Sequence, residues 1–218
     1  MFRMILFTQW KWSRLILLPA VIAAFALPVF SVQAVGTPNQ SGWEARRILS
    51  AVQTWGIAYP LLATGIALAI AMTAWGADHR GRHVYALSLP LPRWNYALQR
   101  FGAGIVLLIA PALALWIGAV LAATTAQIPA GLHAYPVALA ARFTLALAVA
   151  YAVFFAITAG TTRTAGYVLA TLGGIVLIQI FAASAGIEIQ LLPFVSDRLL
   201  LWPGPFEIFS GRWMLIDV

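Results

Sequence analysis

The sequence predicts an all-α integral membrane protein with five transmembrane helices. Of its 218 residues, 62% are hydrophobic and only 9% are charged, which leaves too little polar material to cover the surface of a soluble domain. The apolar residues gather in five runs, and most of the 13 Lys and Arg residues stand at the ends of these runs or between them. A single transmembrane domain over residues 1–218 accounts for both observations.

Each predicted span is a run of about 20 or more residues, the length that a helix needs to cross a hydrocarbon core about 30 Å thick. Trp55 and Trp75 bracket the second run, one for each membrane interface. Several runs contain proline or glycine, which membrane helices tolerate. The five spans cover residues 15–35, 56–75, 101–125, 137–159 and 165–185.

The basic residues indicate which side each loop faces, since cytoplasmic loops carry an excess of Lys and Arg. With the N-terminus inside, the inner segments hold Arg3, Lys11, Arg14, Arg80, Arg82, Arg93, Arg100 and Arg163, and the outer segments before the tail hold only Arg46, Arg47 and Arg142. We therefore expect a multi-pass protein of a bacterial-type cytoplasmic (inner) membrane with its N-terminus inside.

Two segments allow a second interpretation. Residues 1–34 have the basic start, apolar run and Val32-Gln33-Ala34 string of a signal peptide, but the run is longer than the usual core of about 7–15 residues, so we favour a retained span. In residues 43–55 the apolar positions recur near helical spacing, which fits either an outer helix lying on the bilayer or an ordinary loop.

Residues 186–218 form the predicted external tail. Prolines at positions 193, 203 and 205 exclude a long helix there. Trp213-Met214-Leu215-Ile216 reads as the start of a further apolar run that ends before it has the length of a span.

Motifs for covalent chemistry are missing from the sequence. There is no cysteine, no G-x-x-x-x-G-K-[ST] phosphate loop, and no Asp, Glu or Lys within the five spans. The last absence argues against a carrier driven by protons or sodium, because such carriers use ionisable groups near the middle of the membrane. His79 and His83 are spaced like metal ligands, but the surrounding arginines repel cations, so a solvated loop is the better interpretation. We expect no enzymatic activity, metal or cofactor in this chain, and no nucleic-acid partner.

The longest polar and charged segment is Asp78–Arg100, DHRGRHVYALSLPLPRWNYALQR. The Ser-Leu-Pro-Leu-Pro string at 88–92 cannot form one uninterrupted helix. We expect a short amphipathic helix over 82–89, a proline break and a second helical start near Arg93. The basic residues predict that this segment lies on the cytoplasmic side.

The segment resembles the membrane subunits of type 2 ABC transporters, the exporter-like permease class. Members typically have an acidic residue and a glycine after the second span, then a helical piece that ends in a Leu-Ser-x-Pro-like string and a basic residue. Asp78, Gly81, Leu87, Ser88, Leu89, Pro90 and Arg93 fit that description. The general layout extends over the whole chain, whereas the distinctive string covers residues 78–100. The family has six spans, so the sixth is missing or truncated here.

The resemblance implies that residues 78–100 are a coupling segment that docks on a separate P-loop ATPase, which would hold the ATP and Mg²⁺. The chain would then be a permease subunit working in the bilayer with a second copy or a homologue, as a homodimer or heterodimer. The implied ATPase-coupling residues are Asp78, Arg80, Gly81, Arg82, Tyr85, Leu87, Leu89, Pro90 and Arg93. The leucines and tyrosine offer an apolar ridge, and the arginines can pair with acidic groups of the partner.

Two alternatives to docking and transport follow from the same residues. The arginines of the segment could rest on anionic lipid of the inner leaflet. The protein could also be a non-transporting assembly factor or receptor whose basic loop recruits a partner. Within the spans, Trp116 and Gln179 are candidates for a substrate path, although packing and bonding between helices explain such residues equally well.

Overall fold

The computed structural model describes residues 1–33, 44–80, 92–126, 128, 131–160, 162–184, 191–201 and 203–217. Most of these residues are helical, and the chain divides into two compact units. Unit 1 comprises Met1–Phe155 and Arg212–Val218, and unit 2 comprises Ala156–Gly211. Because the division reflects packing alone, the single permease domain over residues 1–218 stays a prediction.

Four helical stretches of the described chain are long and apolar enough to cross a membrane, so the chain is a helical membrane protein. They are Phe2–Gln33, Val52–Gly76, Arg93–Thr125 and Pro136–Ala159. The first four predicted spans fall on these stretches. The predicted count of five is not reached, because the described apolar stretch in the region of the fifth span is only Gly173–Ala182.

Helices α1 (Phe2–Gln33) and α5 (Arg93–Thr125) both begin well before the apolar runs that predicted them. Their 32 and 33 residues correspond to about 50 Å each at 1.5 Å per residue, against a hydrocarbon core of about 30 Å. The basic residues of the N-terminal segment therefore lie on the same helix as the first span. The predicted helical start near Arg93 is confirmed, with Pro92 immediately before it.

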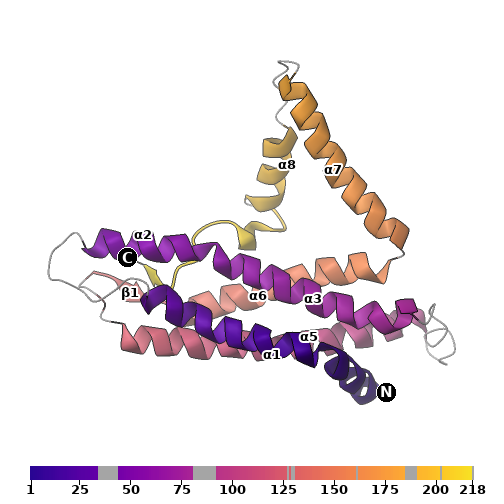
Figure 1. The fold of residues 1–218 in the computed structure, drawn as a ribbon, viewed down its shortest axis with the longest axis horizontal. Helices are drawn as coiled ribbons and strands as arrows, with labels where there is room; N and C mark the ends of the chain where they lie inside the picture. Colours follow the sequence, from indigo (N-terminus) through magenta and orange to yellow (C-terminus); the bar gives the residue numbers. More distant parts are fainter. Residues whose placement is uncertain are drawn as a thin grey trace. The chain divides into compact units, whose positions relative to one another are not determined.

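Helix α1 packs mainly along α5, and α3 (Ala58–Arg80) contacts both, as Figure 1 shows. The two long helices approach closely where a glycine of α5 faces the backbone of α1. At Gly118 of α5, an added Cβ would collide with the backbone carbonyl of Phe25 on α1. Without a hydrophobic force between helices in lipid, such close backbone contact is a main source of association.

Helix α6 (Pro136–Ala159) contacts the rest of unit 1 through large aromatic side chains. Tyr151 stacks against Phe101 of α5 with ring centroids 5.3 Å apart, and Phe155 lies at the same distance from Trp75 of α3. Tyr151 is completely buried, and its phenol occupies the space where a Cβ of Gly104 would stand. Gly104 is therefore required for the position of this ring.

At one end of unit 1, which we call the strand end, β1 (His133–Ala134) pairs antiparallel with β2 (Ile216–Asp217). The backbone N–H of Tyr135 also donates to the carbonyl of Leu215 at 2.8 Å. Helix α2 (Glu44–Gly56) forms in the region where the sequence allowed either a helix or a loop. It contacts β2.

The apolar residues near the C-terminus do not lie in a helix of the described chain. Trp213, Leu215 and Ile216 are instead buried in unit 1, and Ile216 lies in β2. The strand pairing satisfies the backbone groups of β2. The Trp213 ring packs on Tyr59 of α3, and α2 contacts β2.

Unit 2 contains α7 (Thr162–Ser184), α8 (Leu191–Leu200) and the short 3₁₀ helix η1 (Glu207–Phe209). Helices α7 and α8 contact each other, and α8 contacts η1. The exposed side chains of α7 include Val176, Leu177, Ile178, Ile180 and Phe181. A helix with apolar side chains on all sides needs an apolar surrounding, as a bilayer provides.

Candidate functional site

The polar segment predicted to contact a partner connects α3 to α5. Asp78 and Arg80 lie in the last turn of α3, and Arg93 is the first residue of α5 and is exposed. The predicted helix over 82–89 and the coupling residues Gly81, Arg82, Tyr85, Leu87, Leu89 and Pro90 lie outside the described residues. The structure therefore positions both ends of the segment.

Arg100 joins the two helices that carry this segment. It lies on α5, and only 9% of its surface is exposed. Its Nε donates to the Tyr96 hydroxyl at 2.8 Å, its Nη2 donates to the same hydroxyl, and its Nη1 donates to the carbonyl of Ala74 on α3. A single guanidinium thus bonds to both α3 and α5.

Aromatic rings enclose this guanidinium. Its Cζ lies 4.9 Å from the ring centroid of Tyr96 and 5.5 Å from that of Trp75. The two rings contact each other edge to face at 6.4 Å, and Phe155 of α6 packs on Trp75. We refer to Ala74, Trp75, Tyr96 and Arg100 as the Arg100 cluster.

The hydrogen bonds contribute more to the Arg100 cluster than the stacking does. Bonds to a charged group are worth about 1.5–3 kcal/mol each, against about 0.5–2 kcal/mol for a cation over an aromatic ring. A cation removed from water needs such partners, because burying an unpaired charge is strongly destabilising. The cluster can therefore hold the ends of α3 and α5 together.

Buried polar groups occur on α1 near the same end of unit 1. Gln9 and Ser13 are buried, and the Ser13 hydroxyl donates to the Gln9 carbonyl at 2.8 Å. The buried amide of Gln9 interacts with the buried hydroxyl of Tyr151 on α6. Polar side chains buried in a membrane domain are rare enough that these two mark a second polar region beside the Arg100 cluster.

A second arginine has similar surroundings at the strand end. The Nη1 of Arg142 on α6 donates to the carbonyl of Arg212 at 2.7 Å, and its Cζ lies 4.9 Å from the ring of Trp213. We call Arg142, Arg212 and Trp213 the Arg142 cluster. It joins α6 to the C-terminal segment at the strand end, which makes it a matched control for the Arg100 cluster.

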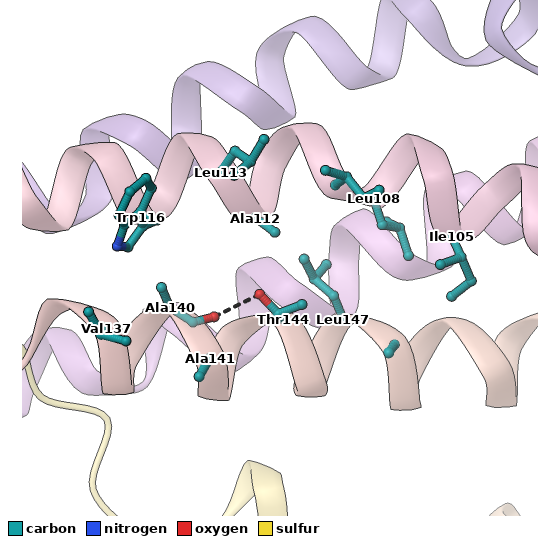
Figure 2. Close-up of a pocket in the computed structure, with 12 residues that line it drawn as sticks. Ile105, Leu108, Ala112, Leu113, Trp116, Val137, Ala140, Ala141, Thr144 and Leu147 are labelled. Atoms are coloured by element: carbon teal, nitrogen blue, oxygen red, sulfur yellow. Dashed lines mark hydrogen bonds between the residues drawn. The ribbon is translucent and has the colours of Figure 1, made fainter.

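Trp116, the first candidate for a substrate path, lines an apolar groove between α5 and α6 with a volume of about 350 Å³. Figure 2 shows its ring pointing from α5 toward α6, close to Val137. The Thr144 hydroxyl in this groove donates to the Ala140 carbonyl at 2.8 Å, so it offers little to a ligand. From Ile105 to Trp116 the groove follows α5 for about 16 Å. Such a groove suits an apolar chain or a helix and not a polar solute.

Gln179, the second candidate, lies on α7 in unit 2 and is partly buried. It belongs to a different compact unit from Trp116, so each candidate is described within its own unit. Its environment on an apolar helix fits bonding within that helix or to a neighbour.

A metal centre has no support in the described part of the chain, where no three His, Cys, Asp or Glu side chains come together. His79 lies in the last turn of α3, and His83 lies outside the described residues. The interpretation of these two histidines as part of a solvated loop therefore stays a prediction.

The sequence reasoning counted Arg100 as one more basic residue of a polar segment and missed its burial. A signal was present, because Tyr96 and Arg100 stand four residues apart on a helix, where side chains meet. The partner on α3 could not be found in this way, since Ala74 contributes only its backbone carbonyl.

Comparisons of the chain with protein-family models, with curated proteins and with solved structures found no match. The resemblance to type 2 ABC permeases therefore rests on the residues of segment 78–100 and on the order of the spans.

Proposed function

We propose that the chain is the membrane-spanning permease subunit of an ATP-binding cassette transporter, and that it moves a substrate across the cytoplasmic membrane with energy from a separate P-loop ATPase. One observation carries this proposal. The longest polar and basic segment of the chain joins two membrane helices whose adjoining ends share a buried arginine. A partner that binds such a segment acts on both helices together.

In this proposal the chain crosses the membrane five times, and α7 is the fifth crossing. Its 23 residues correspond to about 35 Å, enough for a hydrocarbon core of about 30 Å. The N-terminus and the connection from α3 to α5 face the cytoplasm. The loop before α6, helix α2 and the C-terminal strand face outward, and their meeting at the strand end of unit 1 supports this arrangement.

The chain contributes positioning and a path, while ATP and Mg²⁺ belong to the partner. Two permease copies, or a copy and a homologue, enclose the substrate path. The exposed Arg93 at the start of α5 pairs with an acidic group of the ATPase, and the apolar side chains of segment 81–91 cover an apolar surface on it. Closure of the ATPase on nucleotide then moves α3 and α5.

Affinity purification of the full-length protein in mild detergent tests the proposal, with mass spectrometry of the proteins that copurify. We expect a P-loop ATPase with the unchanged protein and its loss in the double variant Leu89→Asp plus Arg93→Glu. Arg212→Glu is the control, because it reverses a charge on a side chain that is 75% exposed at the strand end. That variant should retain the ATPase.

The same experiment separates transport from recruitment. If no ATPase appears with the unchanged protein under conditions that preserve ABC transporter complexes, the permease proposal is wrong. Copurification of some other partner that depends on Leu89 and Arg93 would instead favour an assembly factor or receptor.

A further inference from the structure

The Arg100 cluster lies at the base of the connection between α3 and α5. Ala74 stands six residues before Arg80, where α3 ends, and Arg100 stands seven residues after Arg93, where α5 begins. At 1.5 Å per residue the cluster is about 10 Å from the end of each helix. The last turns of α3 and the first turns of α5 lie beyond it, and residues 81–91 connect them in the sequence.

The backbones of α3 and α5 contact each other less extensively than either contacts α1. Arg100 adds a direct bond between them, because its guanidinium donates to the Ala74 carbonyl on α3 and to the Tyr96 hydroxyl on its own helix. The Trp75 ring lies against the same guanidinium from the α3 side. These contacts fix both the separation and the rotation of the two helices at this point.

We propose that Arg100 is a positioning residue that makes the ends of α3 and α5 move as one body when a partner acts on segment 81–91. The inference rests on the proposed function, in which that partner is an ATPase. Without Arg100 the segment still docks, but each helix end responds separately and the movement that reaches the membrane helices is reduced. Arg100 touches neither the ATPase nor the substrate, so its effect is on coupling and not on docking.

Spin labels test this in the full-length protein, alone and with its copurified ATPase. The chain contains no cysteine, so the substitutions Met72→Cys and Trp94→Cys give one label on α3 and one on α5. Both side chains are exposed, at 59% and 67%, and neither belongs to the Arg100 cluster. Pulsed electron paramagnetic resonance then gives the distance distribution between them, without nucleotide and with MgATP trapped by vanadate.

We expect one narrow distribution in the labelled parent protein, which shifts as a whole on nucleotide trapping. Arg100→Ala should widen it at least twofold and halve the nucleotide shift, while the ATPase copurifies within twofold of the parent amount. Arg100→Lys should give a width and a nucleotide shift between those of Arg100→Ala and those of the parent, because an ammonium can bond to the Ala74 carbonyl but not also to Tyr96 in the same geometry. Tyr96→Phe removes only the hydroxyl that accepts from Arg100. If Arg100→Ala does not fold, the width of the distance distribution in Tyr96→Phe tests the positioning role in its place.

Arg142→Ala is the matched control, because it removes an arginine that likewise bonds to a carbonyl and lies over a tryptophan, at the strand end. It should leave the width and the shift unchanged. The positioning role is overturned if Arg100→Ala matches the parent, or if Arg142→Ala widens the distribution as much. If no ATPase copurifies with the parent, the proposed function fails, but the distributions without nucleotide still test the positioning role. Widening in the variants of the Arg100 cluster and not in Arg142→Ala supports the role, and equal widths in all variants refute it.

Discussion

The indole of Trp213 stacks on the phenol of Tyr59, with ring centroids 6.3 Å apart and planes only 9° from parallel. The Tyr59 hydroxyl lies 3.1 Å from the Ser31 hydroxyl on α1. Trp213 also carries the Arg142 guanidinium near its ring. The C-terminal segment thereby contacts α3 and α6 directly, and reaches α1 through Tyr59.

Replacement of Trp213 by alanine should therefore lower the stability of unit 1. The side chain is 3% exposed, and truncation of a buried tryptophan costs about 3–5 kcal/mol. Thermal unfolding in detergent, followed by tryptophan fluorescence, measures the loss. Trp94→Ala removes a ring that is 67% exposed and should change stability by no more than about 0.5 kcal/mol. Equal effects of the two variants would show that the C-terminal segment does not stabilise unit 1.

Gly118→Ala should separate α1 from α5 and destabilise the protein by about 1–3 kcal/mol, because overpacking against backbone cannot be relieved by rotating a side chain. The added Cβ would meet the carbonyl of Phe25. Gly65→Ala on α3 is the control, since nothing lies within 4 Å of a Cβ built there. That variant should be neutral or slightly stabilising, because alanine favours a helix by about 0.5–1 kcal/mol over glycine. A Gly118→Ala protein as stable as Gly65→Ala would contradict the close approach of the two helices.

The four spans on α1, α3, α5 and α6 could be predicted because the part of a helix that crosses the hydrocarbon core must be apolar, and a linear run shows this directly. The start of α1 could not, since its first turns contain the same basic residues that loops contain, whereas the start of α5 at Arg93 was predicted from the prolines that precede it. A pattern of apolar residues carries no information about helix ends that lie in the interface.

Contacts between distant parts of the chain were equally out of reach. The apolar string at Trp213 resembles the start of a span, and only the structure shows that it leads into a strand paired with β1. Arg100 forms its bond to α3 through a backbone carbonyl, which every residue has. The contacts of Trp213 and of Arg100 depend on how other elements pack and not on their neighbours in the sequence.

The orientation of α5 gives a contrast between two adjacent residues. Leu115 is completely buried, whereas Trp116 is 42% exposed and lines the groove between α5 and α6. Leu115→Ala should cost about 2–5 kcal/mol of stability, and Trp116→Ala no more than about 0.5 kcal/mol. If the groove lies on the substrate path, Trp116→Ala should also change ATP hydrolysis stimulated by an apolar substrate, with basal hydrolysis unchanged. A larger loss of stability from Trp116→Ala than from Leu115→Ala would show that α5 is rotated relative to this structure.

The topology predicts which positions a membrane-impermeant maleimide can reach. Because the chain has no cysteine, the unchanged protein gives no background, and single substitutions report their own sides. Met4→Cys at the start of α1 and His133→Cys on β1 both replace exposed residues. In intact spheroplasts His133→Cys should react and Met4→Cys should not, while both should react after permeabilisation. Labelling of Met4→Cys in intact spheroplasts would put the N-terminus outside. The connection from α3 to α5 would then face outward as well, where no cytoplasmic ATPase could bind it.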